Sequence, residues 1–330
     1  MADLSKKRII MIHGLASKPP EADLHTLWSR CLIENIRVEN KGLAKDLEDH
    51  PEALVHAYWA DATPHHIPDE KRYTTKLSAQ VDKVIAERKK AKERFHVGRG
   101  ERFASFFKSR ALDVVNVFSR ALTIKDDVMK NYLAETKLYD EDQYVADQMR
   151  KRLEEELISA WDDGCDVTIL SHSMGTFISY DVLWRFSHRA TEPWKKYRNK
   201  RVQMFVTMGS PLADSEIRGM LFAKVHREKG KRGFPTNIDR WHNYACLGDV
   251  VSHEHDFEGD FFKEMKELKL LPKKPKHHAI DYANLHNPFE VVTHPGNKNS
   301  EKRNPHKSYG YLVQPRLGSW VSDFLLGRLR

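Results

Sequence analysis

A serine stands where a strand-like pattern meets a helix-like pattern. The apolar, β-branched residues 167–170 predict a short buried strand, and the apolar spacing that begins at Phe177 predicts a helix. Between them lies the stretch 171–175 (SHSMG), in which Ser173 has a small residue two positions away on either side. A strand, a tight turn bearing a serine and a helix form a nucleophile elbow, whose strained turn exposes the serine hydroxyl. The alternative is an ordinary buried strand whose serine only caps the next helix.

A serine hydroxyl needs two partners before it can act as a nucleophile. A neighbouring imidazole must accept its proton, and a carboxylate must orient that imidazole and stabilise its cation. In a parallel sheet such groups lie in the loops beyond the carboxyl ends of the strands. Asp249 lies just past the predicted strand 241–247, and His306 lies between the last predicted strand and the final helix. We therefore predict that Ser173, Asp249 and His306 form a catalytic triad, in the chain order described for hydrolases with this elbow.

Other residues compete for the roles of acid and base. Asp214 is the main alternative acid, because it follows the preceding predicted strand, 202–208. The chain has 18 histidines, and four more lie near the same predicted strand ends: His253, His255, His286 and His294. The stretch 253–256 (HEHD) combines residue types that bind metals. No H-E-x-x-H helix accompanies it, so we interpret this stretch as a polar loop.

Two backbone amides are candidates for stabilising the negative charge of a reaction intermediate. Residues 8–13 (RIIMIH) form a continuous apolar run, typical of a buried parallel strand, and Gly14 and Leu15 follow it. A strand that ends in His-Gly commonly opens the loop that supplies one donor of an oxyanion hole. We expect the N–H groups of Leu15 and Met174 to form this hole, the second at the start of a helix, where the amides favour negative charge.

Further apolar runs predict the sheet and the helices that would position these groups. Six runs have the length and composition of strands: 8–13, 53–59, 167–170, 202–208, 241–247 and 278–285. Besides the helix of the elbow, three stretches have helical spacing: 24–36, 140–161 and 320–329. Strands that alternate with helices are typical of an α/β protein with a parallel sheet and right-handed crossovers.

Residues 61–137 do not follow this alternation. The segment is long, charged and mostly helical in propensity, and its centre, 102–122, is amphipathic. We predict that the chain, 1–330, is a single α/β domain in which this helical insertion folds over the active site as a lid, since long insertions in compact domains are usually functional. The rival interpretation is a helix that binds a membrane surface. The aromatic residues of 102–122 would also suit a contact between two copies of the chain, so the sequence does not decide the oligomeric state.

The chain is basic, with a formal net charge of +8. Its basic residues gather in four segments: 89–99, 195–201, 224–232 and 263–276. Such clusters attract anionic lipid, nucleic acid or acidic substrates, but we interpret them as solvated surfaces, with peripheral contact to anionic membranes as the alternative. No zinc finger, RNA-recognition signature or phosphate-binding glycine loop accompanies them, so we expect no specific binding of nucleic acid.

Composition also bears on redox chemistry and location. Cys31, Cys165 and Cys246 are widely spaced and odd in number, which indicates neither a disulfide framework nor a zinc cluster. No apolar run approaches the roughly 18 to 20 residues that cross a bilayer, and the mean hydropathy is −0.65. The N-terminal residues lack the features of a signal peptide, so we expect a cytoplasmic protein.

Five stretches together resemble the α/β-hydrolase superfamily, and within it the lipase- and esterase-like serine hydrolases of bacterial type. They are IIMIHGL, TILSHSMGTFISYDVL, VTMGSPL, WHNYACLGDVV and NPHKSYGYL, spaced in the expected order along nearly the whole chain except 61–137. The chain departs from the family pattern at Ser171, which replaces the first glycine of the elbow motif. It also departs at Val250, where proline more usually follows the acid.

The resemblance implies an eight-stranded, mostly parallel sheet and hydrolysis through an acyl-enzyme, with no metal or organic cofactor. It implies a small-molecule or lipid-like ester as the substrate. An amide or peptide is the alternative, because the same triad serves both reactions. A non-catalytic basic protein that binds membranes or nucleic acid on a hydrolase fold is a further alternative, which an intact triad disfavours.

Overall fold

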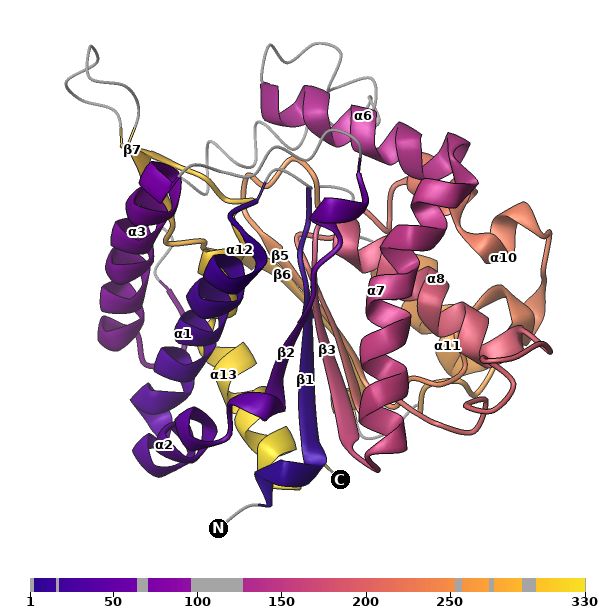
Figure 1. Ribbon diagram of the computed structural model, residues 1–330, viewed down its shortest axis with the longest axis horizontal. Helices are drawn as coiled ribbons and strands as arrows, with labels where there is room; N and C mark the ends of the chain where they lie inside the picture. The colour runs from indigo at the N-terminus through magenta and orange to yellow at the C-terminus, as the bar shows by residue number, and fades with distance from the viewer. Residues whose placement is uncertain are drawn as a thin grey trace.

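The structure is a computed structural model that describes residues 3–15, 18–63, 71–95, 127–252, 257–272, 276–292 and 301–329. Within these residues the chain forms an α/β fold in which helices flank one parallel sheet on both faces (Figure 1). The sheet divides the molecule into two helical layers, and the strands run with their carboxyl ends toward the top of that view. The prediction of an α/β protein with a parallel sheet is confirmed.

Six parallel strands form this central sheet in the order β2-β1-β3-β4-β5-β6. Their bounds are β1 Lys7–Ile12, β2 Leu54–Ala57, β3 Asp166–His172, β4 Met204–Met208, β5 Trp241–Cys246 and β6 Ala279–Leu285. The resemblance implies eight strands, and the central sheet has six among the described residues. Two further strands, β7 (Glu290–Val292) and β8 (Glu301–Arg303), form a separate antiparallel pair.

Two groups of helices cover the faces of the sheet. One layer packs around α1 and consists of α1 Glu21–Glu39, α2 Lys41–Asp49, α3 Lys71–Lys90, α12 Ser308–Leu312 and α13 Pro315–Leu325 (Figure 1). The other consists of α6 Asp127–Glu141, α7 Gln143–Asp162, α8 Met174–His188, α9 Ser215–Met220, α10 Phe222–Val225 and α11 Lys263–Glu267. Because both faces are covered, β4 and β5 are buried along their whole length.

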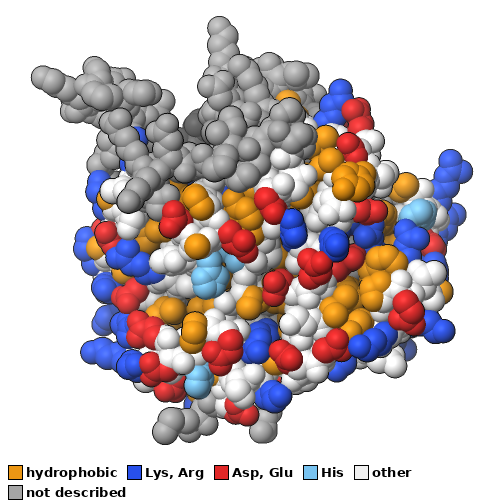
Figure 2. Space-filling view, viewed as in Figure 1, with side chains coloured by type: hydrophobic (Ala, Val, Ile, Leu, Met, Phe, Trp, Pro, Cys, Tyr) orange, Lys and Arg blue, Asp and Glu red, His pale blue; other side chains and the backbone are white. Residues whose placement is uncertain are grey.

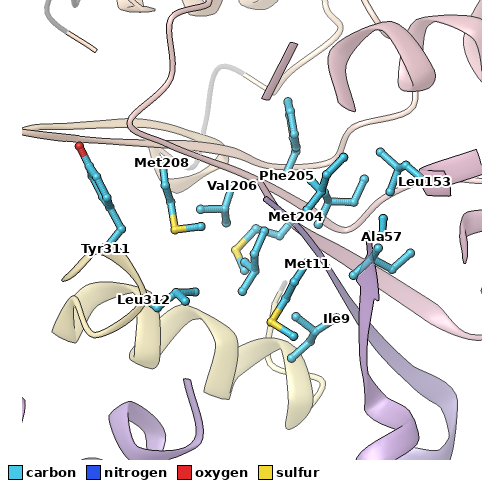
Figure 3. Close-up of a cluster of buried hydrophobic side chains, with 14 of the residues drawn as sticks. Ile9, Met11, Ala57, Leu153, Met204, Phe205, Val206, Met208, Tyr311 and Leu312 are labelled. Atoms are coloured by element: carbon cyan, nitrogen blue, oxygen red, sulfur yellow. The ribbon is translucent and has the colours of Figure 1, made fainter. Parts of the chain in front are cut away.

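The core lies on both faces of the central strands. Met204 and Phe205 are neighbours in β4 and extend to opposite faces of the sheet, as successive residues of a strand must (Figure 3). Leu312 of α12 lies on the Met204 side, and Leu153 of α7 lies on the Phe205 side. All four side chains are fully buried, so each helical layer contributes its apolar face to the core.

The predicted elements are found close to where the sequence places them. All six predicted strands are confirmed. β3 is longer than predicted, and the others are shifted or shortened by a few residues at their ends. The predicted helix 24–36 is longer than expected and begins at Glu21, while the final helix begins earlier than expected, at Pro315. One helix, α2, was not predicted from the sequence, because it is short and mostly polar. Asn40 caps its N-terminus: the side-chain oxygen of Asn40 accepts a hydrogen bond from the Leu43 N–H at 3.0 Å.

The described ends of the segment 61–137 are helices α3 and α6. α3 packs along α1, and the buried guanidinium of Arg88 ties the two helices by donating hydrogen bonds to Asn35 and Glu39. This part of the segment therefore belongs to a helical layer beside the sheet. The amphipathic centre, 102–122, lies outside the described residues, and the lid stays a prediction. None of the helices that the structure describes has the length and apolar character needed to span a membrane.

Ion pairs engage many of the basic residues in the four predicted clusters. Lys89 pairs with Glu34 at 3.0 Å, Lys196 with Asp162 at 3.0 Å, and Arg232 with Glu228 at 2.7 Å. On the face viewed in Figure 2, lysine and arginine side chains are interspersed with acidic ones. This surface is therefore mixed in charge, as we expect if the basic segments are solvated surfaces.

Candidate active site

Ser173 is held in a strained backbone conformation between β3 and α8. Its φ of 54° and ψ of −127° are rare for a residue with a side chain, and such outliers cost about 1 to 3 kcal/mol and cluster at functional sites. Its N–H donates to the Met208 carbonyl at 2.9 Å, and its own carbonyl accepts hydrogen bonds from Thr176. The Ser173 side chain makes no capping hydrogen bond to α8, so the alternative of a serine that only caps the helix is wrong.

Two glycines let other backbone segments approach Ser173. A Cβ atom on Gly175 would lie 2.6 Å from the His13 carbonyl oxygen, and one on Gly14 would lie 2.7 Å from the Cβ of Ser173. The start of α8 and the end of β1 therefore nearly touch. Ser171 is tolerated in place of the expected glycine because its hydroxyl donates a hydrogen bond to the Val206 carbonyl on β4, at 2.7 Å.

His306 connects the serine to the acid. Its Nε2 lies 2.8 Å from Ser173 Oγ, and its Nδ1 lies 2.9 Å and 3.0 Å from the two carboxylate oxygens of Asp249. The carboxylate accepts a hydrogen bond from Nδ1–H, which leaves the lone pair of Nε2 free to accept the serine proton. The structure thus brings the three predicted triad residues together from the ends of β3 and β5 and from the loop before α12.

Asp249 is fully buried and remains ionised. The pKa of its carboxyl is about 2, below the ordinary value. Burial alone raises this pKa, but the charge of His306 and the hydrogen bonds from His306, Tyr311 and the Val251 N–H outweigh it. A buried carboxylate that keeps its charge can stabilise an imidazolium formed beside it.

Tyr311 supports the acid, and the sequence analysis missed it. Its hydroxyl donates to Asp249 Oδ2 at 2.6 Å and accepts a hydrogen bond from the Cys246 N–H at 3.0 Å. One α12 side chain thus links the carboxylate to the end of β5. The ring of Tyr311 is fully buried. In the sequence it therefore resembles an ordinary aromatic core residue, and nothing there indicates that its hydroxyl contacts Asp249.

His172 supports the base, and the sequence analysis assigned it no role. Its Nε2–H donates to the backbone carbonyl of His306 at 2.7 Å, and the two rings lie 4.8 Å apart. Burial and, after it, the charge of His306 hold the pKa of His172 well below its usual range, so the ring is neutral. The sequence signal that could have indicated a role for His172 is its position directly before Ser173, at the carboxyl end of a predicted strand.

Gly209 gives the acid and base room at the end of β4. Its φ is +56°, and an added Cβ would lie 3.0 Å from Asp249 Oδ2 and 3.1 Å from His306 Nδ1. Any larger residue would press on the hydrogen bond that joins these two side chains. The backbone of β4 can therefore pass directly beside the acid–base pair only because residue 209 lacks a side chain.

The predicted oxyanion donors, Leu15 and Met174, belong to the two chain segments that meet at Ser173. Leu15 follows Gly14, which touches Ser173, and Met174 is the first residue of α8, where amides have no intrahelical acceptor. Hydrogen bonds fix the loop that carries Leu15. The Nδ1–H of His13 donates to the Gly14 carbonyl at 2.8 Å, and its Nε2 accepts the Trp59 N–H at 3.1 Å.

The competing candidates have other roles or lie outside the described residues. Asp214 caps α9, where its Oδ1 accepts the N–H groups of Glu216 and Ile217 at 2.8 Å and 3.2 Å. The residues His253, His255 and His294 and the stretch 253–256 are not among those that the structure describes. His286 contributes its backbone carbonyl to a hydrogen bond from Gln314. Among the histidines that the structure describes, His306 is the one whose side chain is hydrogen-bonded to Ser173.

The described part of the chain offers no grouping of three or more His, Cys, Asp or Glu side chains that could hold a metal ion. The three cysteines are free thiols, and all are buried.

Comparison of the chain with models of protein families, with curated proteins and with solved structures found no match.

Proposed function

We propose that the chain is a serine hydrolase of the α/β-hydrolase superfamily that cleaves a carboxylic ester through an acyl-enzyme on Ser173. The observation that carries the proposal is the unbroken hydrogen-bond chain from Ser173 Oγ through His306 to Asp249, with contacts of 2.8 Å and 2.9 Å. The strained backbone of Ser173 supports it, because a strained turn at the nucleophilic serine is typical of this elbow.

The first half of the reaction forms the acyl-enzyme. His306 Nε2 removes the proton of Ser173 as Oγ attacks the carbonyl carbon of the substrate, and Asp249 stabilises the imidazolium that results. The N–H groups of Leu15 and Met174 then hold the oxyanion, and each such donor is worth about 3 to 4 kcal/mol in comparable sites. His306 returns the proton to the departing alcohol, which leaves the acyl group on Ser173.

The second half hydrolyses this intermediate. His306 accepts a proton from water as the water oxygen attacks the acyl carbon, and the same amides again hold the oxyanion. Collapse of the second tetrahedral intermediate breaks the bond to Ser173 Oγ, which takes the proton back from His306. The products are a carboxylic acid and the free enzyme, and every proton transfer in the cycle passes through His306.

Burst kinetics test the proposal. With 4-nitrophenyl acetate, the protein is expected to release one equivalent of nitrophenol rapidly and then to turn over more slowly. Ser173→Ala is expected to abolish the burst. Ser179→Ala is the matched control, because its hydroxyl is also buried and donates to the Gly175 carbonyl one turn along α8. A wild-type protein without a burst or turnover on any short-chain ester would favour the non-catalytic alternative.

Amide hydrolysis is the second candidate, because the same triad serves both reactions. Matched pairs of 4-nitrophenyl esters and 4-nitroanilides with the same acyl chain separate the two. An esterase is expected to favour the ester by far more than the difference in uncatalysed rates. If the predicted insertion 61–137 forms a lid over an apolar acyl group, the same series of substrates should show a preference for longer acyl chains.

A further inference from the structure

Trp59 contacts the loop that carries the predicted oxyanion donor Leu15, although it follows a different strand. His13 and Gly14 follow β1, Trp59 follows β2, and these two strands are neighbours in the sheet. Trp59 donates two hydrogen bonds to His13, from its backbone N–H to the ring Nε2 at 3.1 Å and from its indole Nε1–H to the backbone carbonyl at 2.9 Å. Both residues are fully buried, so water does not compete for these contacts.

The hydrogen bond from the Trp59 N–H fixes the tautomer of His13. A backbone N–H can only donate, so Nε2 must present a lone pair, and the proton of the neutral ring is then on Nδ1. Burial holds the pKa of His13 well below its usual range, which keeps the ring neutral. The Nδ1–H donates to the Gly14 carbonyl at 2.8 Å. Trp59 therefore makes this donor available to Gly14.

The ring of His13 in turn sets the direction of the Leu15 N–H. The Gly14 carbonyl and the Leu15 N–H belong to one planar peptide group, so in the trans form they point in opposite directions. Because the carbonyl is turned toward the ring of His13, the N–H points away from it. The Leu15 N–H makes no hydrogen bond within the part of the chain that the structure describes. Such a donor on a residue that is only 9% exposed is available to a bound group.

This peptide group lies beside the nucleophile. A Cβ atom on Gly14 would lie 3.2 Å from Ser173 Oγ and 2.7 Å from Ser173 Cβ. The nitrogen of Leu15 is two covalent bonds from the Cα of Gly14, so it lies close to Ser173 as well. An oxyanion donor stabilises charge only when its N–H is aimed at the place where the charge develops. The direction of the Leu15 N–H therefore matters as much as its position.

The peptide group before Gly14 is also held. Its carbonyl, that of His13, accepts the indole N–H of Trp59 and lies 2.6 Å from the place that a Cβ atom on Gly175 would take. The rings of His13 and Trp59 are stacked, with centroids 4.8 Å apart and planes 12° from parallel. Neither peptide group that flanks Gly14 can then rotate without breaking a buried hydrogen bond.

We propose that His13 is a positioning residue for the oxyanion hole, and that Trp59 holds it in the tautomer that this role requires. The inference rests on the proposed function, because an oxyanion forms only if Ser173 attacks a carbonyl group. His13 acts through the Gly14–Leu15 peptide group and not on the substrate itself. The alternative is that His13 and Trp59 only fill the core.

Two substitutions of His13 separate these roles. Phenylalanine fills the space of the ring without a donor, so His13→Phe is expected to lower kcat on 4-nitrophenyl acetate about tenfold to a hundredfold with little change in KM. Asparagine leaves unfilled space, but its amide nitrogen, like Nδ1, is bonded to Cγ and can donate to the Gly14 carbonyl. His13→Asn is therefore expected to keep more of the kcat than His13→Phe while it has the lower melting temperature. Core filling alone predicts the opposite order of kcat.

Two further measurements locate the effect of His13→Phe. Trifluoroacetone forms a tetrahedral adduct with an activated serine, and the adduct carries an oxyanion. Its inhibition constant is expected to rise by the factor by which kcat/KM falls, as for a transition-state analogue. The midpoint of the acidic limb of the pH–rate profile is expected to keep its wild-type value, because the hydrogen bonds among Ser173, His306 and Asp249 are unchanged.

His242→Phe is the matched control. His242 is also fully buried and donates its Nε2–H to a backbone carbonyl, that of His277, at 2.7 Å, but it lies near the amino-terminal end of β5. This variant is expected to keep the wild-type kcat. Wild-type kcat in His13→Phe, an equal loss in the control, or an unchanged inhibition constant would overturn this inference and leave the proposed function standing. A wild-type protein without a burst or turnover would overturn both.

Discussion

His172 donates its Nε2–H to the backbone carbonyl of His306 at 2.7 Å, although 134 positions separate the two residues. This hydrogen bond joins the turn that carries the serine to the loop that carries the base. The position of the His306 ring relative to Ser173 therefore depends on His172. A nucleophile and a base on separate loops need such a link, because a displacement of about 1 Å can cost a hundredfold in rate.

We predict that His172→Phe, which keeps a ring but loses the donor, lowers kcat ten- to about a hundredfold with little change in KM. His172→Gln can donate from its amide and is expected to recover part of the rate. Steady-state kinetics on a 4-nitrophenyl ester check both variants. A His172→Phe protein with the kcat of the wild type would show that His306 is positioned by other contacts.

Substitution of the acid distinguishes Asp249 from Asp214. Asp249→Asn is expected to lower kcat by about 10⁴, because an amide cannot hold His306 in the tautomer that accepts the serine proton. Asp214→Asn is the control and is expected to leave kcat and stability nearly unchanged, since asparagine caps helices as well as aspartate. Loss of activity in the Asp214 variant with retention in the Asp249 variant would reverse the assignment.

Gly175→Ala is predicted to destabilise the protein by about 2 to 3 kcal/mol and to abolish activity. The new Cβ would lie 2.6 Å and 2.9 Å from the carbonyl oxygens of His13 and Ile12, which are backbone atoms of β1 and its loop. Urea unfolding and ester hydrolysis check the two effects. Gly219→Ala in α9 is the control, because nothing lies within 4 Å of its added Cβ. A Gly175→Ala protein as stable as this control would contradict the close contact.

His56→Phe is predicted to stabilise the protein, and more so at low pH. Both ring nitrogens of His56 are buried without a hydrogen-bond partner among the described residues, a condition that costs about 1 to 3 kcal/mol. Burial, then the charges of His25 and Lys18, lower its pKa to about 3. The ring thus stays neutral in the folded chain while it gains a proton in the unfolded chain below about pH 6.5, so its presence destabilises the fold as pH falls.

Urea unfolding at two pH values measures this effect. At pH 7 the variant is expected to be more stable than the wild type by about 1 kcal/mol. At pH 4 the difference is expected to grow by about 3 kcal/mol. The partly exposed His50 provides the control, since His50→Phe should show no comparable growth. A difference between His56→Phe and wild type that does not depend on pH would contradict a buried neutral imidazole.

The central strands and the proximity of Ser173, Asp249 and His306 were predictable because their signals are local. Residues 204–208 are apolar except for Thr207, and a strand buried on both faces has this composition. Asp249 and His306 were found from their places after predicted strands. Tyr311 and His172 were not, because their roles depend on atoms that only the folded chain brings together.

Other features were out of reach for different physical reasons. The number of strands came from resemblance to a family and not from the residues, and the described central sheet has six. α2 is short and mostly polar, and most of its stabilising contacts are with α1 and the preceding and following chain. The segments 195–201 and 263–276 each predict a charged surface, but no sequence pattern shows that Arg201 and Lys269 share one cavity.

The most direct test of the account is labelling with a fluorophosphonate probe, followed by mass spectrometry of the modified peptide. The wild-type protein is expected to gain one adduct, located on Ser173, because the probe reacts with a serine activated by a neighbouring histidine. Ser173→Ala and His306→Ala should not label, while Ser179→Ala should label like the wild type. An adduct on another residue, or a folded wild-type protein that does not react, would contradict the proposal that Ser173 is a catalytic nucleophile.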